Sequence, residues 1–193
     1  MAQPQVADRE REAEPVLVRE GVTVEEYLGM PETAAPHNLI EGRLYMSAAP
    51  TPRHQEIVLE LATRLHQVAK EAGGRAYVSP ADYLLRDGTV VQPDVSFITA
   101  TRLDIVQQRL VGAPDIAIEV LSPGTRRFDR VRKLRTYEKN GVREVWLVDP
   151  DSQTVIVFFN AGTNWEREQS VLFGDDIPSA IATVGTGGLE QFA

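Results

Sequence analysis

The strongest hydrophobic pattern in the chain predicts a helix over residues 53–71. Apolar residues recur there every three or four positions, the spacing that gives a helix one apolar face. Gly73 and Gly74 follow and predict the end of this helix. A shorter helix is predicted at 24–30, because Thr23 begins a capping-box pattern. The apolar face of the longer helix comprises Ile57, Val58, Leu61, Leu65 and Val68.

Short stretches with strand character occupy much of the remaining sequence. They are rich in Val, Ile, Tyr and Phe and are separated by Gly, Pro and Asp, the residues that favour turns. A turn at Glu41-Gly42 divides the first stretch, and Asp87-Gly88 predicts a hairpin turn further on. The predicted extended segments are 38–47, 76–80, 81–85, 89–98, 114–122, 144–150 and 154–159, with a short helix at 103–109 and further strands within 165–192.

A basic helix is predicted over residues 126–140, after the break at Pro123-Gly124 and before Gly141. The order of helix, strands, helix and more strands predicts an α/β fold, in which helices flank a mixed sheet. A chain of 193 residues with 42% hydrophobic content favours one domain, placed here at 15–193. Residues 1–14 are polar and charged, and they predict a flexible tail rather than a secretory signal.

Composition narrows the possible functions. The chain has no cysteine, which excludes disulfides and thiolate metal sites and favours a reducing, cytoplasmic compartment. No segment predicts a membrane span. The net charge of −8 argues against a protein that coats nucleic acid, because phosphates attract positive surface. Within 126–139, however, seven Arg and Lys residues accompany two acidic ones, so this helix either engages DNA or forms a solvated face.

Two predicted strands carry acidic residues within otherwise apolar segments. Alternate residues of a strand share a face. In 89–98, Asp94 therefore lies opposite the apolar side chains, and in 114–122 the residues Asp115 and Glu119 do the same. A buried carboxylate is costly unless a cation compensates it. The compensating charge is either a magnesium ion, which prefers oxygen ligands, or a nearby arginine in a structural ion pair.

The basic helix could place a further cation beside these acids. Asp129, Lys133 and Tyr137 are spaced by four residues and are expected along one face, with Val131 and Leu134 supplying packing contacts. A lysine beside two carboxylates can polarise water and stabilise charge on a phosphate. The structural alternative for Lys133 is an exposed surface lysine.

Several of these segments together resemble one known family. The resemblance extends from Val22 to Phe159 and is carried by motifs in a fixed order, which makes it more specific than any single motif. These motifs are IEGRLYMS, PTPRHQEIVLELATRL, VVQPDVSFI and PDIAIEVLSPGTRRFDRVRKLRTYEKNGVREVWLVDP. The chain resembles the Uma-two family of restriction endonucleases within the PD-(D/E)XK nuclease superfamily. The resemblance implies a four-stranded mixed core sheet flanked by helices, with the active site at its edge.

The resemblance also implies a set of catalytic residues. Asp94 follows a proline as in the PD element, and Glu119 matches the second acidic position. Superfamily members often have a lysine two residues after the second acid, where this chain has Leu121. Lys133 on the following helix is the position that the resemblance implies instead. Asp94 and Glu119, with the Val120 carbonyl as a further ligand, would hold the metal.

Four other residues match the family pattern and are candidates for accessory roles. Glu41 either supports the metal ligands from behind or binds a second metal ion, or it is an ion-pair partner of an arginine. His54 either binds substrate or caps the start of its helix. Asp129 and Tyr137 either take part in the chemistry or hold the helix in place.

The function implied is magnesium-dependent hydrolysis of DNA phosphodiester bonds, with manganese as a substitute metal and a homodimer as the assembly. Arg126, Arg127 and Arg130 are expected to contact the DNA. Two alternatives remain open at this point. One is a catalytically silent nuclease fold that binds DNA or regulates, and the other is a metal-dependent hydrolase of a small phosphate ester.

Overall fold

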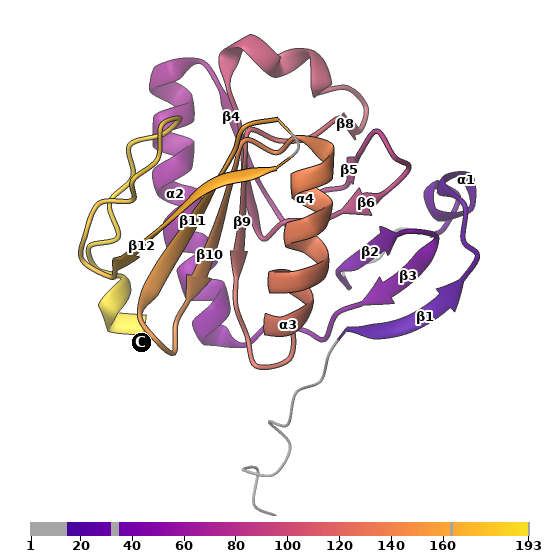
Figure 1. Cartoon of the computed structure of the whole chain (residues 1–193), viewed down its shortest axis with the longest axis horizontal. Coiled ribbons are helices and arrows are strands. Elements are labelled where there is room, and N and C mark those ends of the chain that lie inside the picture. Colours follow the sequence, from indigo (N-terminus) through magenta and orange to yellow (C-terminus); the bar gives the residue numbers. More distant parts are fainter. Residues whose placement is uncertain (1–14, 32–34, 163, 193) are drawn as a thin grey trace, which may run out of the picture.

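Two six-stranded mixed sheets form the frame of the protein (Figure 1). A computed structural model describes residues 15–31, 35–162 and 164–192. The expected tail at 1–14 lies outside the described residues. The fold is α/β, as predicted, with helices packed on both faces of the central sheet.

The central sheet has the strand order β12-β11-β10-β9-β7-β4. Its middle strands β9 and β10 run parallel, and every other neighbouring pair is antiparallel. This mixed sheet is larger than the four-stranded core that the resemblance implies. Its strands are β4 (Arg75–Val78), β7 (Val95–Ile98), β9 (Ile116–Val120), β10 (Glu144–Asp149), β11 (Thr154–Asn160) and β12 (Trp165–Leu172).

The second sheet lies beside the first and has the order β1-β3-β2-β6-β5-β8. Its hairpin β2–β3 turns through Glu41 and Gly42, whose φ angles are 52° and 72°. Positive φ at both central residues is the geometry of a two-residue hairpin that matches strand twist. The strands are β1 (Val16–Glu20), β2 (His37–Ile40), β3 (Arg43–Met46), β5 (Tyr83–Leu84), β6 (Val90–Val91) and β8 (Leu110–Val111).

Each face of the central sheet has its own hydrophobic core. The long helix α2 (Pro52–Ala72) covers one face, where the apolar residues of 53–71 pack against alternate residues of β7 and β9. The opposite face is covered by one continuous helical segment, made of α3 (Arg126–Phe128), the π-helical turn η3 (Asp129–Lys133) and α4 (Leu134–Asn140). Glu119 therefore faces this second helix, as its place in the strand pattern predicts.

Several predicted elements are confirmed, including the helix at 53–71, the basic helix and the hairpin turn at Asp87-Gly88. Another confirmed element is α1 (Val24–Leu28), which begins at a capping box formed by Thr23 and Glu26. Within the described residues, no helix is long and apolar enough to cross a membrane.

Three predictions about the elements are wrong in detail. The expected strand at 89–98 is two strands in different sheets, because the chain turns from one sheet to the other at Pro93. The expected helix at 103–109 is the 3-10 helix η2 (Ala100–Ile105), which begins earlier. Within 165–192, the one long strand β12 is followed by irregular chain and the 3-10 helix η4 (Leu189–Phe192).

We expect Gly74→Ala to lower the free energy of unfolding by about 1–3 kcal/mol, because a Cβ there would lie 2.6 Å from the backbone oxygen of Ile98. Gly187→Ala is the matched control, since a Cβ at Gly187 meets no atom within 4 Å. The control should change stability by less than about 0.5 kcal/mol. Urea denaturation measures both, and equal stability of the two variants would contradict the prediction.

Candidate active site

Asp94 and Glu119 lie beside each other where β7 begins and β9 ends. In the antiparallel pairing of these strands, the outermost pair joins Val95 to Ile118, so Asp94 lies one residue beyond it, next to the Glu119 position. The Asp94 Oδ2 atom accepts a hydrogen bond from the Val120 backbone N–H at 2.8 Å. This bond satisfies an amide that the shortened β7 leaves without a ladder partner. The corner at Pro93 thus fixes Asp94 against the strand that carries Glu119.

Side chains from the helical segment hold both carboxylate oxygens of Glu119. The Lys133 Nζ atom donates to Glu119 Oε2 at 2.8 Å, and the Tyr137 hydroxyl donates to Oε1 at 2.5 Å. Lys133 also lies 3.4 Å from the Asp129 carboxylate, one helical turn away. The structure therefore joins the three principal predicted residues, and it adds Asp129 and Tyr137 to the same cluster.

The π-helical turn helps to align these side chains. In a regular α-helix, residues four apart drift around the axis by about 40°, which would separate Asp129 from Tyr137 by about 80°. The wider turn between Asp129 and Lys133 offsets part of this drift. The expectation that Val131 packs inward is wrong, because it is 59% exposed; two residues from Lys133, it points to the opposite side of the helix. Leu134 packs against the core as predicted, together with Phe128 and Tyr137.

Exposure within the cluster shows the side from which solvent reaches it. The Asp94 side chain is 20% exposed and the His54 side chain 11%, whereas the Glu119 side chain is 1% exposed. Asp129 and Lys133 are also buried. Solvent therefore reaches Asp94 and His54 first, and Glu119 lies deepest.

Burial and the neighbouring charges shift the pKa values of the ionisable groups in the cluster. Burial raises the pKa of Glu119 to about 8, and the negative charges of Asp129 and Asp94 act in the same direction against Lys133. Burial also raises the pKa of Asp129. For Lys133, burial lowers the pKa, but the surrounding carboxylates outweigh it and the pKa is raised. The ammonium is thus firmly protonated, and the acids compete for its charge.

His54 contacts the cluster from the first turn of α2. Its Nε2 atom lies 3.1 Å from Asp94 Oδ2, while the helix is capped by Thr51. The capping role expected for His54 is therefore wrong. Burial raises the pKa of Asp94, but the hydrogen bond and charge of His54 outweigh it and the pKa is lowered. Within the described residues, the buried Nδ1 atom of His54 has no hydrogen-bond partner.

Other predicted residues lie outside this cluster. Glu41 sits on the exposed β2–β3 turn and pairs with Lys139 at 3.5 Å, so its partner is a lysine and not an arginine. Asp115 shares a strand face with Glu119, but Arg102 and Arg143 neutralise it at the other end of β9.

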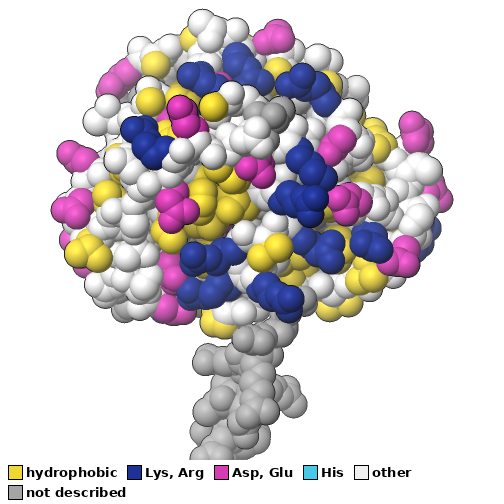
Figure 2. Space-filling model, in the orientation of Figure 1, with side chains coloured by type: hydrophobic (Ala, Val, Ile, Leu, Met, Phe, Trp, Pro, Cys, Tyr) yellow, Lys and Arg dark blue, Asp and Glu magenta, His cyan; other side chains and the backbone are white. Residues whose placement is uncertain are grey.

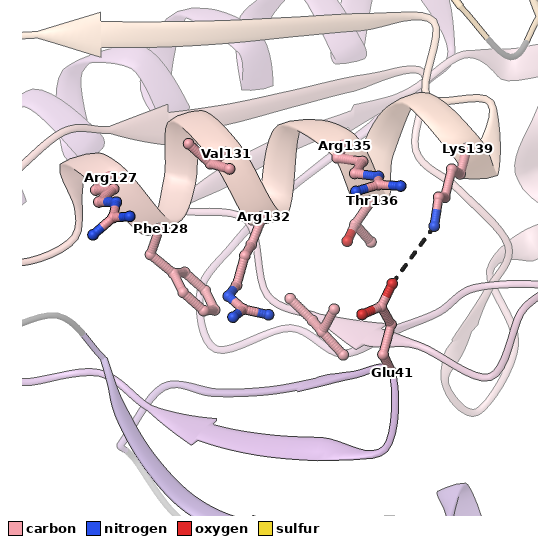
Figure 3. A pocket seen from close by; sticks show the side chains of 9 residues that line it. Glu41, Arg127, Phe128, Val131, Arg132, Arg135, Thr136 and Lys139 are labelled. Atoms are coloured by element: carbon pink, nitrogen blue, oxygen red, sulfur yellow. Dashed lines mark ion pairs between the residues drawn. The ribbon is translucent and has the colours of Figure 1, made fainter.

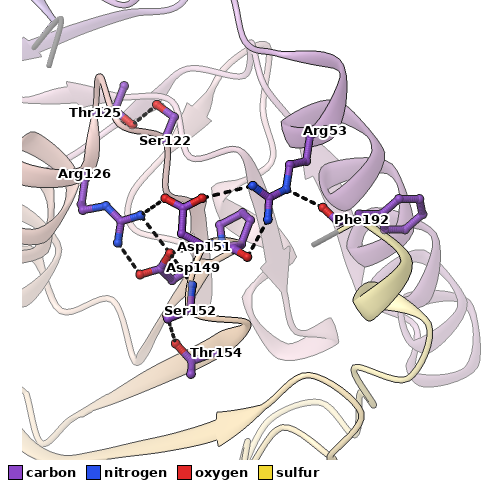
Figure 4. A network of polar contacts seen from close by, with 10 residues as sticks. Arg53, Ser122, Thr125, Arg126, Asp149, Asp151, Ser152, Thr154 and Phe192 are labelled. Atoms are coloured by element: carbon purple, nitrogen blue, oxygen red, sulfur yellow. Dashed lines mark hydrogen bonds and ion pairs between the residues drawn. The ribbon is translucent and has the colours of Figure 1, made fainter. Parts of the chain in front are cut away.

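A polar network near the start of α2 was not expected from the sequence (Figure 4). Arg126 forms ion pairs with Asp149 and Asp151, which follow each other closely at the end of β10. Arg53 also pairs with Asp151, and it donates to the carbonyl oxygen of Phe192. The network fastens the loop after β10 and the last described residues to the helix turn that carries His54. In the sequence, the charge of Arg126 was the one feature that indicated a polar role for a member of this network.

The donor chemistry of the cluster fits magnesium in part. Three carboxylates share one lysine and one histidine, and the negative charges of Asp129 and Asp94 add to burial in raising the pKa of Glu119. Within the described residues, no three or more histidine and acidic side chains are arranged to hold a metal ion. Magnesium commonly uses only one or two carboxylates and completes its shell with water. Asp94 and Glu119 meet that smaller requirement.

Comparison with known proteins agrees with the fold. A family model described as Uma2, putative restriction endonuclease, matches residues 24–185. The chain belongs to the Uma2 family. The resemblance drawn from the sequence motifs is therefore confirmed.

One solved structure similar to this Uma2 chain is a crystal structure from Anabaena variabilis, described as a putative nuclease belonging to DUF820. The two chains superpose with a TM-score of 0.75 and share 24% sequence identity. The match covers 89% of this chain and 98% of the other. At this identity the likeness establishes the fold. No curated protein matches the chain significantly.

We expect the free energy of unfolding to fall with rising pH more steeply in the wild type than in Glu119→Gln. Folding raises the pKa of Glu119 from 4.5 to about 8, so the folded chain holds a proton in this window that the unfolded chain releases. The stabilisation is present below pH 4.5 and is lost as pH rises through 8.

Denaturation of metal-free protein between pH 5 and 8.5 measures this difference, which should be on the order of a few kcal/mol. Glu56→Gln, at an exposed position of α2, is the control and should keep the wild-type slope. Parallel curves for wild type and Glu119→Gln would contradict the assignment.

Proposed function

We propose that this protein is a magnesium-dependent endonuclease that hydrolyses DNA phosphodiester bonds. The observation that carries the proposal is one cluster of three residues. Asp94 and Glu119 lie at adjacent ends of β7 and β9, and Lys133 reaches Glu119 from the helical segment. Membership of the Uma2 family and the nuclease named among similar structures support the same class of reaction. The homodimer stays a prediction from the family resemblance.

The side chains have distinct roles in this proposal. The ammonium of Lys133 would hydrogen-bond a phosphate oxygen and stabilise the negative charge that develops there. Tyr137 would keep the carboxylate of Glu119 in a fixed orientation through its 2.5 Å hydrogen bond. His54 would orient Asp94 in the same way at the solvent-facing side of the cluster.

Asp94 and Glu119 would hold the magnesium ion, with the Val120 carbonyl as a further ligand and manganese as a substitute. A divalent cation there would neutralise charge on the scissile phosphate and favour attack by water. It would also offset the repulsion of Glu119 by Asp129 and Asp94. In the metal-free arrangement Lys133 and Tyr137 occupy the oxygens of Glu119, so metal binding requires sharing these contacts.

Substitutions should separate a catalytic cluster from a structural one. We expect Asp94→Asn, Glu119→Gln and Lys133→Gln each to reduce DNA cleavage at least about a hundredfold, because each removes a ligand or charge used in the reaction. Cleavage of plasmid and single-stranded DNA with Mg²⁺ or Mn²⁺ measures this effect.

The matched control is Asp115→Asn, which changes a buried carboxylate on the same face of β9 outside the cluster. Rates should be normalised to the folded fraction, and the control should then stay within a fewfold of wild type. A wild type as inactive as the three variants on every substrate would instead indicate a silent nuclease fold. Cleavage of a small phosphate ester without cleavage of DNA would indicate the second alternative.

Metal binding can be tested without activity. We expect saturating Mg²⁺ or Mn²⁺ to raise the melting temperature of the wild type, because a ligand that binds only the folded state stabilises it. The Asp94→Asn variant should show no such rise, while Asp115→Asn should respond as the wild type does. An equal response of Asp94→Asn and wild type would place the metal elsewhere.

A further inference from the structure

A basic groove runs between the helical segment 126–140 and the β2–β3 hairpin (Figure 3). Its volume is about 340 Å³. The cations that line it are Arg127, Arg132, Arg135 and Lys139, and the one carboxylate is Glu41. In the same orientation as Figure 1, Lys and Arg side chains gather over the helix and its border with the hairpin (Figure 2). The groove therefore has the charge of an anion-binding surface.

Arg132 and Arg135 keep charge available for a ligand. Within the described residues, no carboxylate pairs with Arg132 or Arg135, and both side chains are exposed. The guanidinium of Arg132 lies 5.3 Å from the centre of the Tyr45 ring, which holds it at the groove floor without neutralising it. Lys139 shares its charge with Glu41 across 3.5 Å, in an exposed pair of little stability.

Arg126 differs from these groove cations. Asp149 and Asp151 both form ion pairs with it, and its side chain points into the network of Figure 4. Two carboxylates therefore already compensate its charge, so a phosphate would have to compete with them. Of the three arginines expected from the sequence to contact DNA, only Arg127 lines the groove.

We propose that this groove binds the sugar-phosphate backbone of DNA, an inference that rests on the proposed nuclease function and names its substrate-binding surface. From Arg127 to Lys139 the helix spans about 18 Å. One strand of B-form DNA carries about five phosphates over that length. Three of the four cations are arginines, whose planar guanidinium groups bind phosphate oxygens in pairs.

The groove and the buried cluster share one helix. Lys133 and Tyr137 point inward to Glu119, while Arg132 and Arg135 line the groove. The groove and the cluster therefore lie on different sides of the same helical segment. Glu41 opposes binding electrostatically and therefore weakens the interaction.

The test is fluorescence anisotropy with a labelled DNA duplex and a labelled single strand, in EDTA and at several salt concentrations. The double variant Arg132→Gln/Arg135→Gln should bind at least about tenfold more weakly at low salt. The slope of log affinity against log salt concentration should become shallower by up to about two, because up to about two phosphate contacts are lost. Glu41→Gln should bind severalfold more tightly, because it removes the opposing charge.

Lys70→Gln is the matched control, since Lys70 is exposed in the last turn of α2 and lies outside the groove. It should change affinity less than twofold, and thermal unfolding checks that all variants are folded. Wild-type affinity in the double variant would overturn the proposal that the groove binds DNA. Absence of DNA binding by the wild type would also overturn it. Equal binding of polyglutamate and DNA would overturn it too, because the surface would then recognise acidic chains in general.

These measurements separate the groove from the proposed catalysis, because binding is measured without metal. Groove-dependent binding by a wild type that cleaves no DNA would support the groove and reject the nuclease. Cleavage by a double variant with wild-type affinity would support the nuclease and reject the groove.

Discussion

The buried ion pair between Lys133 and Glu119 is the interaction on which the rest of this structure depends. Both groups are withdrawn from water, and two further carboxylates, Asp94 and Asp129, lie close enough to influence them. Such a pair is a poor means of stabilising a fold, because apolar residues of similar volume often serve equally well or better. Removing one partner is nevertheless costly, since it leaves a buried charge alone. A cluster with three acids and one lysine is therefore better explained by chemistry than by stability.

The fold builds this cluster from elements that each serve a second purpose. Pro93 turns the chain from one sheet into the other, and the same turn sets Asp94 against the free amide of Val120. The π-helical turn keeps the helix packed on the sheet while it aligns Asp129 with Lys133. Arg53 fastens the start of α2 to the loop after β10, which holds His54 at the opening. Positions in the Asp94, Glu119 and Lys133 cluster are thus fixed by backbone geometry as well as by side-chain contacts.

The sequence predicted the fold class and the main helices because long apolar patterns have one dominant period. It also placed Glu119 on the correct face of β9, since strand alternation is local. Local patterns could not show that 89–98 divides between two sheets, because both halves have strand character and the division is a tertiary feature. For the same reason, the charge of Arg126 suggested DNA contact, although Arg126 forms ion pairs with Asp149 and Asp151 in the structure. Ion pairs between distant segments leave little trace in sequence spacing.

Charge is distributed very unevenly around the helical segment 126–140. Its inward side meets carboxylates and compensates them, while its side toward the β2–β3 hairpin presents Arg127, Arg132, Arg135 and Lys139 across from Glu41. The net charge of −8 therefore does not describe the field near this helix, because screening at physiological salt limits each charge to about 8 Å. Beyond that distance the acidic remainder of the surface repels a polyanion. A protein of this kind would hold nucleic acid only where the helix lies and would release it readily, which suits an enzyme better than a protein that coats its ligand.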